Sequence, residues 1–188
     1  HDIGHPPFAH SGEEELNRLM TRFGDRFEHN LHALRIVEQF ESRYARFPGL
    51  NLTFELREGI VKHSRDLVPG ESPELEQYLP GLRPPLEAQL IDLCDEIAYN
   101  SADLDDAFDA GLVDPAAASS AMPGFADQWE MAEMQYPGAD LKLRMAEVLR
   151  GMMGTLVTGL IEGTKQAADE AGLQSPADVR AHPQRIAR

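Results

Sequence analysis

Hydrophobic residues recur along this chain with the spacing of amphipathic helices. Apolar side chains return every three or four positions between residues 28 and 47 and again between residues 141 and 161, as they do on one face of an α-helix. A third such stretch lies between Pro84-Pro85 and Gly111. Proline favours the start of a helix and glycine its end. No segment of useful length alternates between apolar and polar residues. The pattern therefore predicts an all-α protein.

Short capping signals predict further helices. Ser11, followed three residues later by Glu14, has the spacing of a capping box and predicts a helix that begins there. Thr53 is a good N-cap for a short helix, and a weak, short helix is expected after Gly172. Because Pro, Ala and Ser are frequent just after residue 114, we expect a connector over residues 114–138.

The charge balance is strongly acidic and narrows the classes of partner. The 188 residues include 17 basic and 32 acidic ones, which gives a formal net charge of −15. A protein that binds nucleic acid without regard to sequence needs a basic surface, so this charge argues against that role. The only cysteine, Cys94, excludes an internal disulfide, and no apolar run approaches the roughly 20 residues of a membrane span. We expect a cytoplasmic protein without a membrane partner and, since the chain begins with His1 rather than Met, a stretch of a longer one.

The first residues combine the side chains of a metal site. His1 and Asp2 are adjacent, so they cannot share one face of a regular helix. They can converge on one ion at a bend, which Gly4 and Pro6-Pro7 supply. Imidazole and carboxylate together suit a divalent ion such as Mn, Fe, Co or Mg rather than a thiolate-type zinc site. Most His-Asp pairs are ordinary surface residues, however, and the dipeptide by itself favours that interpretation.

His10 and Glu13 lie three residues apart, within reach of one another across one helical turn. A carboxylate that orients an imidazole makes it a better base, so the pair is a candidate acid–base couple. The alternative is structural: Glu13 favours the helix N-terminus through its charge, and His10 is a polar surface residue. Spacing alone favours this alternative.

Asp95, Tyr99 and Asp103 follow one another at intervals of four residues. Each interval rotates by only about 40° around a helix, so the three side chains share one stripe. Asp95 lies close to the apolar line of its helix, where a carboxylate is costly unless it is paired or bound to a metal. A solvated flank in an acidic stretch explains the spacing equally well.

The stretch from residue 1 to residue 13 reads HDIGHPPFAHSGE, and three further blocks follow at residues 27–37, 49–63 and 86–99. In this order the four blocks resemble the deoxyguanosine-triphosphate triphosphohydrolase family, whose HD-domain signature is written HDxGHPPFxHxGE. The resemblance extends over residues 1–110, and the last third of the chain resembles the family only loosely.

The resemblance implies an all-helical HD-domain bundle that holds one divalent ion, such as Mn, Mg or Co. On the matching positions the metal ligands are His1, Asp2 and Asp95. The family's remaining ligand is a His on an upstream helix with no counterpart here, so we expect this stretch alone to be impaired. We therefore predict an HD-domain core over residues 1–113 with upstream helices missing, the connector, and a C-terminal helical segment over residues 139–188.

The same resemblance implies roles for the other candidates. His10 and Glu13 correspond to the catalytic His and its acidic partner, with His29 as a helper near the phosphates. Tyr99 and Asp103 correspond to residues that pack on the deoxyribose and accept a hydrogen bond from its 3′-hydroxyl.

A triphosphate also needs a cation to offset its charge in so acidic a chain. Lys62 and Arg65, beside His63, are the nearest candidates in the sequence, although an ordinary surface role is at least as compatible with their positions.

The implied activity is metal-dependent hydrolysis of a deoxynucleoside triphosphate, such as dGTP, to a deoxynucleoside and inorganic triphosphate. Two alternatives stay open: another HD-type nucleotide phosphohydrolase, and a degenerate HD module that binds nucleotide without turnover. Assembly of the intact protein into a homo-oligomer is an expectation from the family alone.

Overall fold

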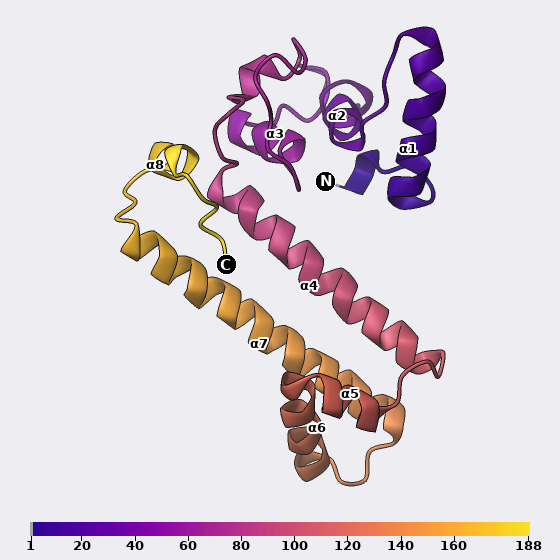
Figure 1. Ribbon diagram of the computed structural model, residues 1–188. Coiled ribbons are helices and arrows are strands. Elements are labelled where there is room, and N and C mark those ends of the chain that lie inside the picture. Colours follow the sequence, from indigo (N-terminus) through magenta and orange to yellow (C-terminus); the bar gives the residue numbers. More distant parts are fainter. Residues whose placement is uncertain (1) are drawn as a thin grey trace. The chain divides into compact units, whose positions relative to one another are not determined.

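The computed structural model describes residues 2–188, and that range contains helices and no strand. The α-helices are α1 (Ala9–Met20), α2 (His29–Arg35), α3 (Phe54–Val61), α4 (Leu86–Asp109), α5 (Pro115–Ala121), α6 (Pro123–Gln135), α7 (Leu141–Glu170) and α8 (Pro176–Ala181) (Figure 1). Short 3₁₀ turns cover Asp2–Gly4, Thr21–Phe23 and Glu76–Tyr78, and a π-helical turn covers Ile36–Phe40. The prediction of an all-α protein is confirmed.

The chain divides into two compact units. The first contains the residues up to Ile91 together with Leu173–Ile186, and the second contains Asp92–Gly172 with the last two residues. α4 begins in the first unit and continues into the second. The domain limits expected at residues 113 and 139 stay a prediction.

The core of the first unit is built from α2, α3 and the segment that joins α3 to α4. Its buried residues are Leu31, Leu34, Val37, Val61, Leu67, Leu75 and Tyr78. The ring of Tyr78 stacks on Phe54 with a centroid distance of 5.7 Å. α3 begins after Thr53 as predicted, and the Thr53 side chain accepts a hydrogen bond from the Leu56 N–H. This core holds α2, which carries His29 at its first position.

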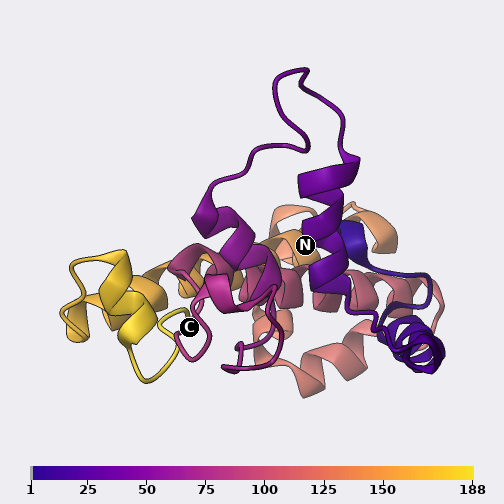
Figure 2. The same ribbon diagram turned by 90° about the horizontal axis from the view of Figure 1, so that it is seen from above.

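The helix expected over residues 28–47 ends earlier, at Phe40. The chain then leaves the helix as an extended loop (Figure 2) and doubles back, so that the Leu50 N–H donates to the Val37 carbonyl at 2.8 Å. Gly49 has a φ of +64°, and a Cβ at this position would collide with the Val37 carbonyl oxygen. The returning loop therefore occupies the end of the helix, where the periodicity of the sequence would otherwise continue it.

α1 begins at Ala9 rather than at the expected Ser11, and no side chain caps it. Phe8 precedes it in the left-handed region with a φ of +67°, and its carbonyl accepts the Gly12 N–H at 3.2 Å. A Cβ at Gly12 would collide with the Pro7 carbonyl. Glycine thus permits a tight first turn that takes the place of the expected capping box.

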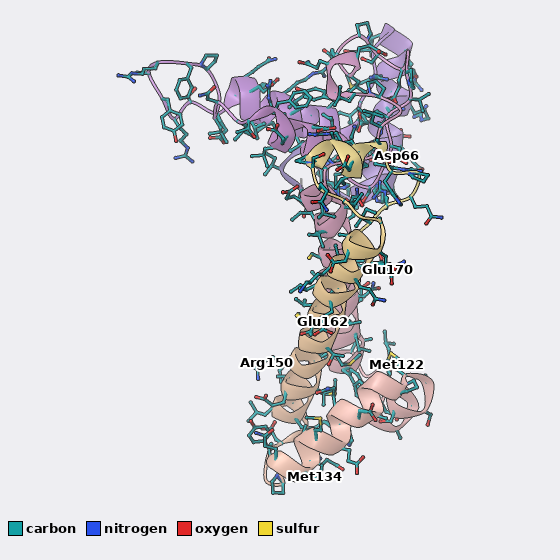
Figure 3. All side chains as sticks on the ribbon, turned by 90° about the vertical axis from the view of Figure 1, so that its left-hand side faces the viewer. Asp66, Met122, Met134, Arg150, Glu162 and Glu170 are labelled. Carbon is teal, nitrogen blue, oxygen red and sulfur yellow. The ribbon has the colours of Figure 1, made fainter. Side chains whose placement is uncertain are left out.

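The second unit packs α5, α6 and α7 with the later part of α4. Its buried residues are Ala118, Phe125, Ala132, Met145 and Val148. Phe125 stacks on Phe108 at 5.7 Å and on Trp129 at 5.9 Å. The expected connector contains α5 and α6, which meet at Met122 (Figure 3). Between residues 2 and 188, no helix combines the length and apolar character that crossing a bilayer requires.

Candidate active site

The opening segment lies against the first turn of α2. Gly4 is buried there, and a Cβ on it would collide with the His29 carbonyl and the Ala33 nitrogen. The His5 N–H donates to the Asp2 carbonyl at 3.0 Å, which closes a turn around Gly4. Glycine at position 4 therefore brings the opening residues close to the helix that begins with His29.

Glu13 of α1 holds His29 through both its backbone and its ring. A carboxylate oxygen accepts the His29 N–H at 2.8 Å, and the two oxygens lie 2.9 and 3.0 Å from Nδ1. Since an ionised carboxylate only accepts, Nδ1 carries the proton and Nε2 is an acceptor in the neutral ring. His10, the partner that the sequence predicts for Glu13, is 3.5 Å away with 79% of its side chain exposed. Glu13 thus lies closer to the ring of His29 than to that of His10.

A third imidazole, that of His5, joins this cluster. Its ring stacks on His29 at 4.1 Å and lies 5.3 Å from His10, while His10 and His29 are 6.0 Å apart. Burial, together with the neighbouring rings of His29 and His10, lowers the pKa of His5 and favours its neutral form. Its buried Nδ1 has no hydrogen-bond partner among the described residues. The sequence alone gives His5 no assigned role. Its position in the block of residues 1–13, together with His10 and Glu13, is the feature that could have identified it.

The pKa of Glu13 reflects this contact with His29. Burial alone would raise the pKa, but the hydrogen bonds from the backbone and ring of His29, its charge, and the bond from His10 outweigh burial. The net result is a pKa below the usual value for a glutamate. Glu13 is therefore a carboxylate held ionised between two imidazoles.

Replacing Glu13 by glutamine is expected to destabilise the first unit only where the carboxylate is ionised. Because the folded-state pKa lies below the unfolded value of 4.5, the stabilisation is complete above 4.5 and disappears as the pH falls through the folded-state pKa. We expect a loss of about 1 kcal/mol at neutral pH and none in strong acid, measured by urea unfolding. Glu14→Gln, an exposed neighbour, should show no loss at either pH, and a pH-independent loss in Glu13→Gln would contradict the assignment.

Asp95, Tyr99 and Asp103 lie on α4 in the second unit, on the helix that the sequence predicts. Asp95 is partly buried, Tyr99 is 49% exposed and Asp103 is exposed. One stripe of α4 thus carries a carboxylate, a phenol and a second carboxylate. Because Asp2 belongs to the first unit, the convergence of Asp2 and Asp95 on one ion stays a prediction.

Lys62 does not fit the phosphate-binding role that its position suggests. Its side chain is fully buried, and its ammonium donates to Glu58 at 2.8 Å and to the carbonyls of Leu79 and Leu82 at 3.0 and 3.1 Å. These three bonds use all three protons of an ammonium group. Lys62 is therefore part of the core, and sequence spacing shows only that Glu58 lies one turn away.

The comparison with protein families decides the family of this chain. Residues 1–100, more than half of the chain, match the family model of the HD domain. The chain belongs to the HD domain family. The matched residues of the HD domain include all of the imidazole cluster, together with Asp95 and Tyr99 on α4.

Curated relatives resemble this chain along nearly its whole length. A deoxyguanosinetriphosphate triphosphohydrolase-like protein of Ralstonia nicotianae is 43% identical over 188 residues, which are 100% of this chain and 48% of the relative. Proteins of the same name from Geobacter sulfurreducens and Deinococcus deserti are 41% and 40% identical, over 96% and 99% of this chain and 46% and 45% of their own lengths. The chain therefore spans about half the length of the curated relatives it matches.

The donor types of the HD domain fit a divalent metal ion. Of the ligands expected from the sequence, His1 lies outside the described residues, Asp2 is an exposed carboxylate of the first unit, and Asp95 is a partly buried one of the second. Among the residues other than His1, no group of three or more His, Cys, Asp or Glu side chains is placed to hold an ion. Carboxylate oxygen and neutral imidazole nitrogen are donors for Mn, Mg or Co. His5, whose buried Nδ1 has no hydrogen-bond partner among the described residues, supplies a further imidazole close in the chain to Asp2.

Proposed function

We propose that this HD domain is the catalytic core of a metal-dependent phosphohydrolase that cleaves a deoxynucleoside triphosphate into a deoxynucleoside and inorganic triphosphate. The observation that carries the proposal is the cluster in which the Glu13 carboxylate contacts the imidazoles of His29 and His10, with His5 stacked on His29. Relatives named deoxyguanosinetriphosphate triphosphohydrolase-like, about 40% identical along the chain, support the substrate class.

His10 is the proton-transfer group in this proposal. His1, Asp2 and Asp95 would hold the divalent ion, which polarises a phosphoryl oxygen when it is bound. His10 is exposed and 3.5 Å from Glu13, so it can take a proton from the attacking water or give one to the departing 5′-oxygen. The Glu13 carboxylate stabilises the positive charge that His10 carries during this step.

His29 and His5 bind the phosphate chain in this proposal. Glu13 fixes the Nδ1–H of His29 and leaves Nε2, when protonated, as a donor to a phosphate oxygen. The His5 ring stacks on the His29 ring at a centroid distance of 4.1 Å, and this contact restricts the orientation of the His29 ring. Two neighbouring imidazoles can donate hydrogen bonds from their ring N–H groups to an anion, although neither ring carries a permanent positive charge.

Tyr99 and Asp103 recognise the sugar. A half-exposed phenol ring offers an apolar face to a deoxyribose, which lacks the 2′-hydroxyl. The exposed carboxylate of Asp103, one turn further along α4, accepts a hydrogen bond from the 3′-hydroxyl.

Product analysis tests the proposal directly. The complete protein is incubated with dGTP or another deoxynucleoside triphosphate and Mn²⁺, and the phosphorus products are identified by ³¹P NMR. We expect tripolyphosphate together with the deoxynucleoside. Orthophosphate or pyrophosphate as the only products would identify a different nucleotide phosphohydrolase, and binding without turnover would identify a non-catalytic HD module.

A further inference from the structure

The first unit contains a cavity away from the imidazole cluster. Its volume is about 560 Å³, within the range of roughly 300–1,000 Å³ that is typical of small-molecule sites. α3, the first turns of α4 and the α8 segment form its walls, and most of the lining is apolar, with Leu56, Ile60, Leu86, Ala88, Ile91 and Pro176. Leu56 and Ile91 are 52% and 48% exposed. The cavity thus offers an apolar surface that no described residue covers completely.

A buried ion network forms one wall of this cavity. Arg180 of α8 lines the cavity and binds the fully buried Glu58, with Nε at 3.0 and 3.2 Å and Nη2 at 2.6 Å from the carboxylate oxygens. The same carboxylate accepts a hydrogen bond from Lys62 at 2.8 Å. Arg180 and Lys62 are therefore both already bonded to Glu58, which lowers their attraction for an incoming anion.

Two further carboxylates lie on the solvent side of the cavity. Glu55, in the first turn of α3, and Glu87, in the first turn of α4, both line it and are exposed. The pKa of Arg180 is raised by its hydrogen bond with Glu58 and by the negative charges of Glu58, Glu55 and Glu87. All three carboxylates are therefore close enough to interact electrostatically with Arg180. Among the described residues, neither Glu55 nor Glu87 forms an ion pair that neutralises it. Glu55, Glu58 and Glu87 together carry one more charge than Arg180 and Lys62 offset, and the two exposed carboxylates carry this excess; the lining also includes His63.

We propose that this cavity binds a small molecule that combines an apolar body with one positive charge, such as an arylalkylammonium ion. The apolar body fills the space between α3 and α4, and the ammonium group meets Glu55 and Glu87 at the opening. An apolar anion of the same shape is repelled by these two carboxylates. The site shares no residue with the imidazole cluster, so the proposal does not depend on the proposed function.

Three probes of one shape test the sign of the charge. The affinities of 4-phenylbutylamine, 4-phenylbutanol and 4-phenylbutyrate are measured by titration calorimetry, with the amide resonances of Gly59 and Ala88 as local reporters of binding. We expect the amine to bind tightest and the carboxylate weakest, with about a tenfold difference between them that shrinks in high salt.

A matched pair of variants locates the effect. Glu55→Gln combined with Glu87→Gln should bring the amine and the carboxylate to within about twofold of each other, since the charges that separate them are gone. Glu130→Gln combined with Glu162→Gln removes two exposed carboxylates from α6 and α7 (Glu162 is labelled in Figure 3) and should keep the tenfold preference. Circular dichroism verifies that both variants are folded.

The proposal is overturned if the amine does not bind at millimolar concentration, or if the three probes bind equally well to the unmodified chain. It is also overturned if the preference for the amine persists without Glu55 and Glu87. Shifts confined to residues other than Gly59, Ala88 and their neighbours would place the binding elsewhere and would refute this site.

Discussion

Replacing Asp95 by alanine in the complete protein is expected to remove the bound divalent ion and the hydrolase activity together. Asp95 is the proposed ligand from α4, where its carboxylate is partly buried, and its loss leaves the ion one donor short. A bound metal contributes several kcal/mol to the stability of the transition state, so we expect activity to fall by about 10³-fold. Elemental analysis of the purified variant and the release of tripolyphosphate measure the two losses.

Two further variants make this result specific. Glu96→Ala, an exposed neighbour on the same helix, should retain both metal and activity. His10→Ala should retain the metal while turnover falls by about 10²- to 10⁴-fold, because it removes the proton-transfer group and leaves the ligands in place. Unchanged metal content in Asp95→Ala would refute the ligand assignment, and full activity in His10→Ala would show that His10 takes no part in catalysis.

Replacing Glu58 by alanine is expected to destabilise the first unit by about 3–5 kcal/mol, because the buried Lys62 and the largely buried Arg180 lose their common partner. Glu58 and Lys62 are fully buried, and Arg180 is 12% exposed. The network joins α3 to the segment Leu173–Ile186, which returns to the first unit from the end of the chain. Hydrogen exchange measures the loss best, at the Ile186 amide, which donates to Gln89 at 2.7 Å.

Glu55→Ala is the matched control for this prediction. Glu55 lies on the same short helix but is exposed, so its removal should change stability by less than about 0.5 kcal/mol. If hydrogen exchange at the Ile186 amide is equally fast in Glu58→Ala and Glu55→Ala, the proposed role of the ion network is contradicted. The triple variant Glu58→Leu, Lys62→Met and Arg180→Met should recover most of the stability, since it removes the three charges together.

Amphipathic periodicity predicts the two long helices of this protein from local sequence alone. α4 begins directly after Pro85 and ends before Gly111, as expected. α7 begins at Leu141, as expected, but continues to Glu170 instead of ending near Ile161. Its buried side continues through Thr164 and Ala167, which are too small or too polar to stand out in the apolar pattern.

Two further helix ends that the sequence misplaces are decided by close approach of the backbone. α1 starts at Ala9 because Gly12 fits against the Pro7 carbonyl, and α2 with its π-turn ends at Phe40 because Gly49 fits against the Val37 carbonyl. The sequence shows these glycines but not the carbonyl that each one meets. Such contacts depend on the path of the chain, which periodicity does not describe.

The sequence by itself determined the helical class, the α4 stripe with Asp95, and the spacing that makes His10 and Glu13 neighbours. Only the tertiary structure decided that Glu13 binds His29, which is 16 residues away, and that His5 stacks on the same ring. The physical reason is packing: a buried Gly4 lets the opening turn approach α2, and this contact has no periodic signal. Packing in the same way places Lys62 in the core, where its ammonium is fully bonded and cannot serve a substrate.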